Sequence, residues 1–165
     1  MLDPDKTFML EALKQAQSAA KADEVPIGAV ITHKNKIIAK AHNQVEMLKD
    51  PTAHAEMIAI TQATSMLGTK WLDGCCLYVT IEPCSMCAGA LVLARIKRIC
   101  FAAADPKTGA CGSVFNIARS NKLNHNIEIK KGTLEQECGE LVSLFFKEKR
   151  KKESSRKQYM PPSLN

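Results

Sequence analysis

The sequence predicts a single α/β domain with a mixed five-stranded sheet that is covered by helices on both faces. The chain has 165 residues, of which 45% are hydrophobic, and both values suit one compact domain. Apolar, β-branched runs alternate with segments of helical periodicity, which is the element order of an α/β fold. A helical segment also joins the apolar runs 75–81 and 98–104, and a right-handed crossover of this kind makes the two strands parallel.

The first part of the chain reads as a helix, a hairpin and a second helix. Asp3-Pro4 is typical of a helix start, and residues at helical spacing continue to about residue 21. The apolar face of this helix consists of Phe8, Ala12, Ala16 and Ala20. The runs 25–32 and 37–43, with a polar turn between them, predict a β-hairpin. Asp50-Pro51-Thr52 indicates the start of the second helix, which Gly68 ends.

The middle of the chain predicts two buried strands and the helix between them. The nearly continuous apolar run 75–81 is typical of a strand that is buried on both faces. We expect a helix at 83–95 and the next strand at 98–104. A loop rich in small residues follows at 105–120, and we expect a short helix near 115–119.

The last part of the chain predicts a short strand and a long helix. The strand covers 126–130, and Thr133 with Gln136 has the spacing of a capping box that starts the helix. We expect this helix to bury Leu134, Leu141, Leu144 and Phe145. Because no linker divides the chain, we assign residues 1–152 to one domain and 153–165 to a basic, proline-containing tail that is frayed.

The positive charge is concentrated at the C-terminus. Residues 147–165 contain seven basic and two acidic residues, whereas the rest of the chain is close to neutral and the whole carries +6. Lysines at a helix carboxyl end interact favourably with the helix dipole, so a solvated helix end explains the charge. A phosphate-binding surface is the alternative explanation. The charge alone does not separate these two interpretations.

Composition also restricts the cellular setting. The longest charge-free stretch is Met57 to Thr69, 13 residues, which is shorter than a membrane-spanning helix requires. The N-terminus has acidic residues from the start and no apolar run, so we expect no secretory signal. The seven cysteines are an odd number and do not suit a secreted disulfide scaffold, so we expect a cytoplasmic protein. Five of them are expected to be small buried residues, namely Cys75, Cys76, Cys100, Cys111 and Cys138.

Two short motifs contain residue types that bind a catalytic metal. Cys84 and Cys87 are three residues apart at the start of a predicted helix, so both sulfurs can reach one ion. His54, at the start of another helix, can supply a third ligand and leaves the fourth position of a tetrahedral zinc ion for water. Helix amino termini lower the pKa of both thiols, which favours metal binding at neutral pH.

Glu56 favours a catalytic zinc site over a structural one. It lies two residues after His54, so its carboxylate can accept a proton from metal-bound water and return it to a leaving group. Each motif alone is weak, because a lone CxxC also suits a redox pair or two small buried residues, and HxE is common. The two motifs together, each at a predicted helix start, are far more specific.

These motifs match the zinc deaminase signature H-x-E…P-C-x-x-C. The chain resembles the bacterial tRNA-specific adenosine deaminases, which are zinc-dependent members of the cytidine/deoxycytidylate deaminase superfamily, over about residues 5–152. Besides HAE and PCSMC, the resemblance rests on EVPIGAVI, HNQ, DPTAHAEM, LYVTIEPCSMCAGALVLARI, DPKTGACGS, LNHNIEI and a Phe-Phe-plus-basic helix.

The resemblance implies a cytidine-deaminase-like three-layer α/β/α fold, a homodimer and one zinc ion per subunit, with no membrane partner. It implies hydrolytic deamination of adenosine to inosine at wobble position 34 of a tRNA anticodon, by zinc-activated hydroxide. On the matching positions His54, Cys84 and Cys87 bind zinc, and Glu56 is the proton shuttle. The resemblance assigns contacts with the anticodon stem-loop to Asn43, Asp105, Lys107, Asn124, His125, Phe145, Phe146 and Arg150. Because Phe145 and Phe146 are adjacent, at least one is expected in the core.

Two other functions remain open at this point. A zinc-dependent deaminase of a free base or nucleoside, of the guanine or cytosine type, would use the same metal site. The basic C-terminal helix argues against it, since a small neutral base gains little from a cationic surface. A structural-zinc or nucleic-acid-binding module without catalysis is the third interpretation. Glu56 and the lack of a fourth Cys or His ligand in these motifs argue against that one.

Overall fold

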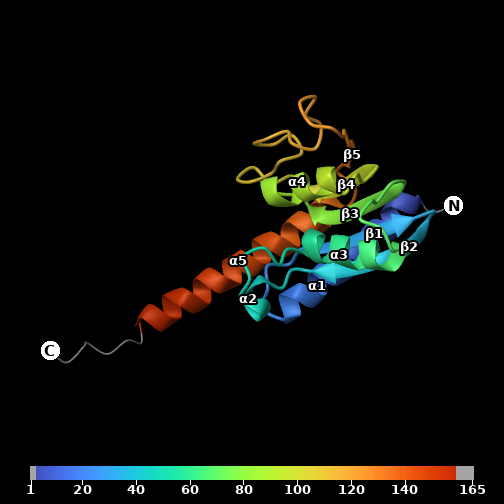
Figure 1. The fold of residues 1–165 in the computed structure, drawn as a ribbon. Helices are drawn as coiled ribbons and strands as arrows, with labels where there is room; N and C mark the ends of the chain where they lie inside the picture. The colour runs from blue at the N-terminus through green and yellow to red at the C-terminus, as the bar shows by residue number, and fades with distance from the viewer. Residues whose placement is uncertain (1–2, 159–165) are drawn as a thin grey trace.

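Three layers make up residues 3–158, the part of the chain that the computed structural model describes (Figure 1). A sheet forms the middle layer and helices form the outer two. In chain order the elements are α1 (Pro4–Lys21), β1 (Gly28–His33), β2 (Lys36–His42), α2 (Val45–Leu48), α3 (Ala55–Leu67), β3 (Cys75–Ile81), α4 (Ser85–Leu93), β4 (Arg98–Ala103), β5 (Glu128–Lys131) and α5 (Glu135–Gln158).

The sheet is the mixed, five-stranded one that the sequence predicts. Its strand order is β2-β1-β3-β4-β5. β1 pairs antiparallel with β2 and β3, whereas β3, β4 and β5 run parallel. The predicted parallel pairing of β3 with β4 across α4 is thus confirmed. Because β3 and β4 point the same way, the segments that follow Ile81 and Ala103 lie at the same edge of the sheet.

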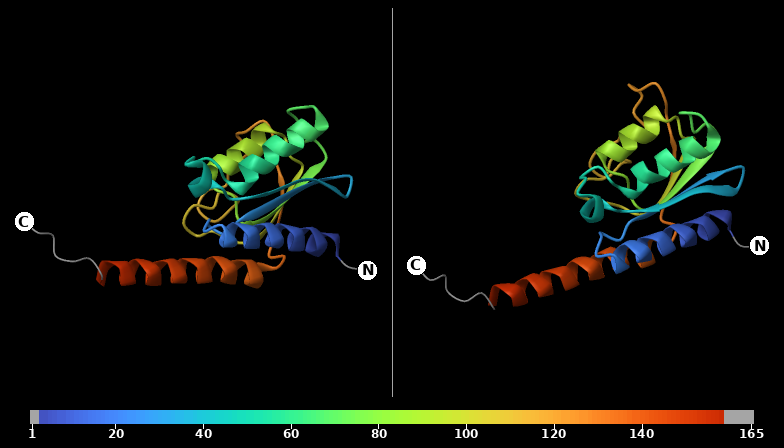
Figure 2. Two further views of the ribbon diagram at one scale, coloured as in Figure 1. Left: turned by 90° about the horizontal axis from the view of Figure 1, so that it is seen from below. Right: turned by 60° about the horizontal axis from the view of Figure 1, so that its bottom comes forward.

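Alternation along the inner strands supplies both faces of the sheet with apolar side chains. On β4, Ile99 and Phe101 pack with α3 and α4, whereas Cys100 and Ala102 pack on the opposite face with Met9 of α1. β1 and β3 alternate in the same way. Two views show α3 and α4 above one face, and α1 and α5 below the other (Figure 2). A strand with a period of two can face two helical layers only if it is apolar along nearly its whole length, as 75–81 is.

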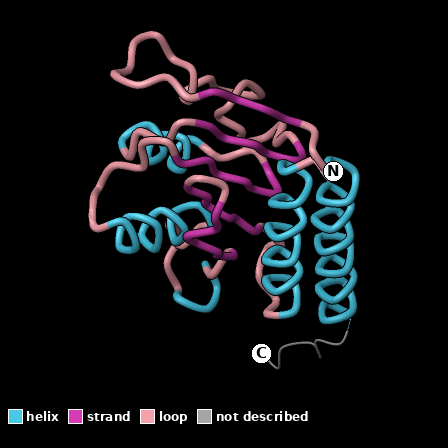
Figure 3. Tube along the Cα trace, turned by 90° about the vertical axis from the view of Figure 1, so that its right-hand side faces the viewer, coloured by secondary structure: helices cyan, strands magenta, loops and turns pink. Residues whose placement is uncertain are grey.

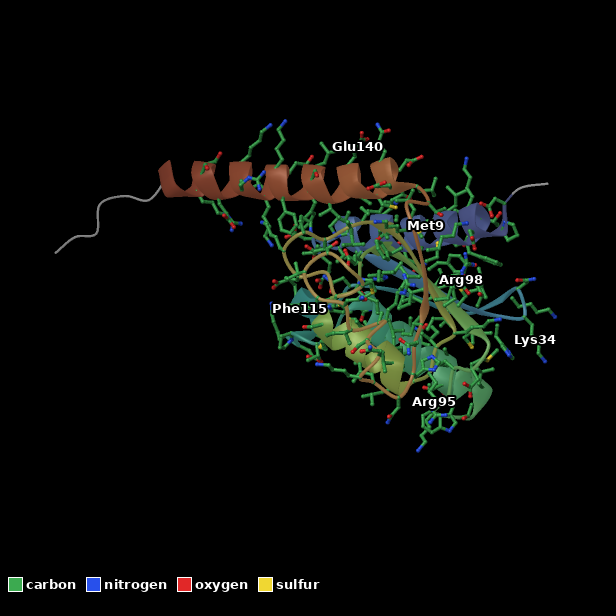
Figure 4. All side chains as sticks on the ribbon, turned by 90° about the horizontal axis from the view of Figure 1, so that it is seen from above. Met9, Lys34, Arg95, Arg98, Phe115 and Glu140 are labelled. Carbon is green, nitrogen blue, oxygen red and sulfur yellow. The ribbon has the colours of Figure 1, made fainter. Side chains whose placement is uncertain are left out.

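Helix α1 begins as predicted and packs on a slightly different stripe. The Asp3 carboxylate accepts a hydrogen bond from the Asp5 backbone N–H, and Pro4 is the first helical residue. Met9, Ala12, Ala16 and Ala19 are the apolar residues that the helix buries, whereas Phe8 and Ala20 are only partly buried. Figure 4 shows Met9 and Arg98 on the side of the sheet that faces α1.

Gly28, at the start of β1, allows α1 to approach the sheet closely. A Cβ atom at this position would lie 2.0 Å from the Ala12 carbonyl oxygen and 2.4 Å from the Ala16 nitrogen. These are backbone atoms of a helix, which cannot move aside as a flexible side chain can. Glycine at the strand start is therefore required by the packing of α1, not by an unusual backbone conformation.

Two local expectations are wrong, and one short helix was not predicted. The helix expected from Asp50 begins at Ala55, because the Asp50 carboxylate accepts hydrogen bonds from the Thr52 backbone and hydroxyl and closes a turn instead. The segment 115–119 is not a helix, and Asn116 forms an isolated bridge with Cys111. The sequence also gave no indication of the short helix α2.

The expected capping box of α5 does not form. The Thr133 hydroxyl accepts a hydrogen bond from the Cys100 thiol, and the Gln136 amide donates to the Glu140 carboxylate. The helix instead begins at Glu135, after Leu134 adopts a left-handed conformation with φ of 58°. A tertiary contact of Thr133 and an i,i+4 contact of Gln136 thus replace the local cap that the spacing predicts.

Helix α5 buries less than expected. It lies beside α1 (Figure 3), and its second half continues past the sheet. Leu144 is 56% exposed and neither phenylalanine is in the core, because only the first turns of the helix face the sheet. The helix reaches Gln158, into the segment 153–165 that we expected to be a frayed tail, and residues 159–165 lie outside the described part.

All seven cysteines are free thiols, and four of the five that we expected to be small buried residues are buried, whereas Cys76 is partly exposed. Within residues 3–158, no helix combines the length and the apolar character needed to cross a membrane.

Candidate metal centre and active site

The predicted metal ligands meet at the amino ends of two helices. His54 is the N-cap of α3, Cys84 is the N-cap of α4, and Cys87 lies in the first turn of α4. The His54 Nδ1 atom lies 3.7 Å from Cys84 Sγ and 3.5 Å from Cys87 Sγ. One ligand atom from each residue lies within 4.8 Å of the others, and these three residues form a potential metal site.

The geometry of this group fits a tetrahedral zinc ion. Zn–N and Zn–S bonds of about 2.1 and 2.3 Å that meet at a tetrahedral angle place nitrogen and sulfur about 3.6 Å apart. Both N···S distances are within 0.1 Å of that value. With three protein ligands, one coordination position is left for water, which is the arrangement of catalytic zinc sites.

Charge interactions in this group favour a thiolate. Hydrogen bonds from Cys87 and His54 lower the pKa of Cys84 to about 4, because they stabilise its ionised form. The thiolate in turn raises the pKa of Cys87 and, through its hydrogen bond, that of His54. One ionised sulfur is therefore available to a metal without any proton loss at neutral pH.

Glu56 has a buried carboxylate with a free oxygen. Its Oε2 atom is inaccessible to solvent and has no hydrogen-bond partner. Burial raises the pKa of Glu56 to about 7, since a desolvated carboxylate is disfavoured in its charged form. Such a group can both accept and donate a proton near neutral pH, which is what general acid–base catalysis requires.

Asn43 shares a small cavity with His54 and Glu56. The cavity has a volume of about 290 Å³, at the lower limit for ligand sites. Asn43 is 5% exposed and its Oδ1 atom, like the Oε2 atom of Glu56, lacks a partner. Buried polar atoms are normally hydrogen-bonded, so two unsatisfied oxygens at one cavity indicate that a ligand supplies the partner.

A second cavity adjoins the first and contains three more of the predicted residues. Asp105, Lys107 and Phe146 line this cavity of about 510 Å³, which shares the side chains of Val25 and Ile27 with the first. The Asp105 carboxylate accepts hydrogen bonds from the backbone of Lys107 and Thr108 and so shapes the wall itself. The structure thus brings Asn43, Asp105, Lys107 and Phe146 around one continuous region.

The remaining predicted contacts lie elsewhere. Phe145 precedes the cavity-lining Phe146 and packs edge-to-face on its ring. Arg150 is exposed on α5. His125 Nε2 lies 2.6 Å from the Ile96 carbonyl, and Asn124 precedes it. Ile96 leads into β4, so these two residues are at the amino ends of the parallel strands, whereas the metal ligands lie at the carboxyl ends. Within one chain they are not part of the site.

Sequence analysis missed three residues of this region. Lys149 of α5 lines the first cavity. Glu24 also lines it, and its buried carboxylate accepts hydrogen bonds from the backbone N–H groups of Glu46 and Met47 at the start of α2. Glu82 is buried directly before the Pro83-Cys84 motif. In sequence these are ordinary charged residues, and only the folded chain places them beside the cavity and the metal-binding turn.

Comparisons with known proteins agree with this geometry. Residues 3–150 match the family model of the MafB19-like deaminases. The chain is 48% identical over 151 residues to the tRNA-specific adenosine deaminase of Bacillus subtilis strain 168, covering 92% of this chain and 94% of that one.

Two solved structures show the same fold. One comes from biochemical and structural work on A-to-I editing by tRNA:A34 deaminases at the wobble position of transfer RNA. It has a TM-score of 0.79 and 43% identity, and the match covers 82% of this chain and 98% of that one. The guanine deaminase of Bacillus subtilis has a TM-score of 0.58 and 34% identity, with 84% and 91% covered.

Proposed function

The chain belongs to the tRNA-specific adenosine deaminase family, and we propose that it converts adenosine to inosine by hydrolysis at wobble position 34 of a tRNA anticodon. One observation carries the chemistry: a His-Cys-Cys donor group adjoins a cavity that contains the unpartnered carboxylate oxygen of Glu56. We assign this activity to residues 1–152 as one catalytic domain, which the family match over 3–150 supports.

We propose one zinc ion per chain, held by His54, Cys84 and Cys87. Zinc bound there supplies Lewis-acid chemistry that lowers the pKa of a coordinated water towards neutrality. The nitrogen–sulfur distances and the thiolate form of Cys84 support this assignment. Two thiolates would balance the charge of the ion.

Glu56 is the proton carrier of the proposed reaction. Deamination forms a C–O bond at C6 of adenine and breaks the C–N bond to its amino group, so both protons of a water molecule must leave oxygen. Glu56 Oε2 accepts one of them and delivers it to ring nitrogen N1. Glu56 then carries the second proton to the amino group, which departs as ammonia. The raised pKa of Glu56, about 7, suits this double role because the carboxylate is readily protonated and deprotonated.

The two adjoining cavities suit a nucleotide with its neighbours better than a free base. We propose that Asn43 binds the flipped adenine through its free amide oxygen, and that Asp105, Lys107 and Phe146 line the site of an adjacent nucleotide. Phe145 and Arg150 extend the contact along α5, and Asn124 and His125 would reach RNA only from a second subunit. The exposed cations of α5 suit the phosphates of the stem.

The test is an editing assay with a matched control. Zinc-loaded protein is incubated with a tRNA that carries adenosine at position 34, and the RNA is reverse-transcribed and sequenced, because inosine reads as guanosine. Glu56→Gln should retain one metal ion per chain and lose about 10²–10⁴-fold in rate. Glu11→Gln, which removes a partly exposed carboxylate on α1, should edit as the original chain does.

Two other outcomes would redirect the assignment. Turnover of free guanine or a free nucleoside, with unedited tRNA, would establish a small-molecule deaminase in the same fold. No turnover of tRNA, free bases or nucleosides by the original chain, with one zinc ion bound per chain, would support a structural zinc module. The wild-type editing pattern, confined to position 34, is the result that we expect.

We further propose that the protein is a cytoplasmic homodimer. Exposed apolar side chains on the helical layer opposite α1 support a covered surface, in particular Met66 of α3 and Leu93 of α4. The free cysteines are in the state that a reducing compartment maintains. Sedimentation across a dilution series should give a dimer mass, which Leu93→Glu should reduce to that of one chain. A monomer at all concentrations would contradict the proposal.

A further inference from the structure

Glu82 holds a loop that is distant in sequence against the metal-binding turn. It is the first residue after β3 and is 3% exposed. Its Oε1 atom accepts hydrogen bonds from the backbone N–H groups of Cys111 (3.0 Å) and Ser113 (3.1 Å). Its Oε2 atom accepts one from the Asp105 N–H (3.0 Å) and another from the Ser113 hydroxyl. One side chain thus satisfies three backbone donors of loop 105–113.

The same loop is joined to the turn that carries the metal ligands. The Ala110 N–H donates to the Pro83 carbonyl at 2.8 Å, and Gly109 forms a bridge with Cys84. Gly109 packs directly on the carboxylate, since a Cβ atom there would lie 2.5 Å from Glu82 Oε2. No side chain larger than hydrogen leaves room for this contact.

A buried carboxylate in this place has a physical cost that its hydrogen bonds offset. Desolvating a charged group is unfavourable unless it is fully hydrogen-bonded, and hydrogen bonds to a charged acceptor are stronger than neutral ones. Without the carboxylate, three N–H groups of an irregular loop would lose their acceptor. The loop begins at Asp105 and includes Lys107, so the wall of the second cavity depends on this anchor.

We propose that Glu82 is a positioning residue that sets the distance between the substrate-binding loop 105–113 and the metal-ligating turn at Cys84. It touches neither the metal ligands' donor atoms nor the cavities, and acts through the loop. The part of this inference that concerns RNA rests on the proposed function. The anchoring itself is independent of any substrate.

The first experiment measures the loop without substrate. Glu82→Gln keeps the shape of the side chain but replaces one carboxylate oxygen by an NH₂ group. In either orientation of the amide, this NH₂ group faces a backbone N–H donor and cannot accept its hydrogen bond. Hydrogen–deuterium exchange in the zinc-loaded protein should accelerate at the amides of Asp105, Cys111 and Ser113 by about 10-fold or more. Unchanged exchange at these three amides would overturn the anchoring.

The second experiment separates positioning from folding. With tRNA as substrate, Glu82→Gln should raise KM by about 10-fold with kcat within about threefold, at one zinc per chain. Asp5→Asn is the matched control, because it removes a buried carboxylate at the other end of the sheet. It should lower the unfolding temperature and leave KM unchanged. Equal loss of kcat and kcat/KM in Glu82→Gln at full zinc content would overturn the positioning role.

A second variant guards against a folding defect in the first. Gly109→Ala leaves Glu82 in place but forces the loop away from it, and it should show the same rise in KM. Glu82→Asp, which keeps the charge, should recover part of the lost affinity. If the wild-type chain does not edit tRNA, the proposed function fails while the exchange result still decides the anchoring.

Discussion

Replacing Asp5 by asparagine removes the charge that joins α1 to three strands of the sheet. The Asp5 carboxylate accepts hydrogen bonds from both terminal nitrogens of Arg98, at 2.9 and 2.7 Å. It also accepts hydrogen bonds from the Tyr78 hydroxyl at 2.8 Å and from Lys130. Tyr78 belongs to β3, Arg98 to β4 and Lys130 to β5, so a single side chain in the first turn of α1 contacts all three parallel strands.

The expected loss of unfolding free energy depends on how deeply each partner of Asp5 is buried. Removing one member of a buried ion pair costs about 3–5 kcal/mol, because the other charge is left uncompensated. Arg98 is 23% exposed and has a further partner in Glu128 at 3.3 Å, which places the loss at the lower end. Lys130 is 41% exposed, so its share is under about 1 kcal/mol. We expect Asp5→Asn to lower the free energy of unfolding by about 3 kcal/mol.

The measurement is denaturant and thermal unfolding of both proteins. About 3 kcal/mol corresponds to a fall in Tm of roughly 6–12 °C for a domain of this size. Glu11→Gln breaks two more exposed ion pairs, whose lysine side chains are 65% and 42% exposed, and should cost under about 1 kcal/mol. A loss below about 1 kcal/mol for Asp5→Asn would refute the reasoning that this buried pair holds α1 to the sheet.

The pH dependence gives an independent check. The hydrogen bonds from Arg98, Lys130 and Tyr78 hold the pKa of Asp5 well below its ordinary value of 3.8, although burial opposes them. A carboxylate with a depressed pKa stabilises the fold above its unfolded pKa, and that contribution is lost as the pH falls through the folded one. The stability difference between the two proteins should therefore be constant above about pH 5 and shrink below about pH 4.

Three further perturbations follow from the packing, the metal site and the basic helix. Gly28→Ala should cost at least about 3 kcal/mol in denaturant unfolding, because the new methyl group meets the Ala12 carbonyl, and an unchanged midpoint would contradict that contact. His54→Ala should reduce bound zinc from one per chain to a small fraction by mass spectrometry, and full occupancy would exclude it as a ligand. Neutralising Lys151 and Lys152 with glutamine should weaken tRNA binding and make the slope of log K against log salt less steep by about 1.5, whereas an unchanged slope would place RNA away from α5.

Local patterns in the sequence were sufficient for most elements. Asp3-Pro4 marked the start of α1, and the apolar run 75–81 marked a strand buried on both faces, since each depends on residues that are neighbours in the chain. Prediction failed where one local sequence pattern is compatible with two different structures. The Asp50 carboxylate closes a turn, although the same residue before a helical pattern is typical of an N-cap.

The chemistry of the metal centre was also readable from the sequence, because ligand types and their spacing determine which ion they suit. The distances of 3.7 and 3.5 Å from His54 Nδ1 to the sulfurs of Cys84 and Cys87 could not be predicted from the sequence, since they depend on how α3 and α4 lie on the sheet. The same holds for Asn43, whose free amide oxygen lies at the cavity of Glu56.

The sequence by itself determined the alternation of helices and strands, the metal-binding residue types and the basic C-terminus. These follow from periodicity, spacing and charge, which are properties of neighbouring residues. Only the tertiary structure decided that Glu82 anchors a loop 23 to 31 residues away, and that His125 binds the carbonyl of Ile96 at the end of the sheet remote from the metal ligands. Hydrogen bonds between distant residues depend on the path of the whole chain, which no local pattern records.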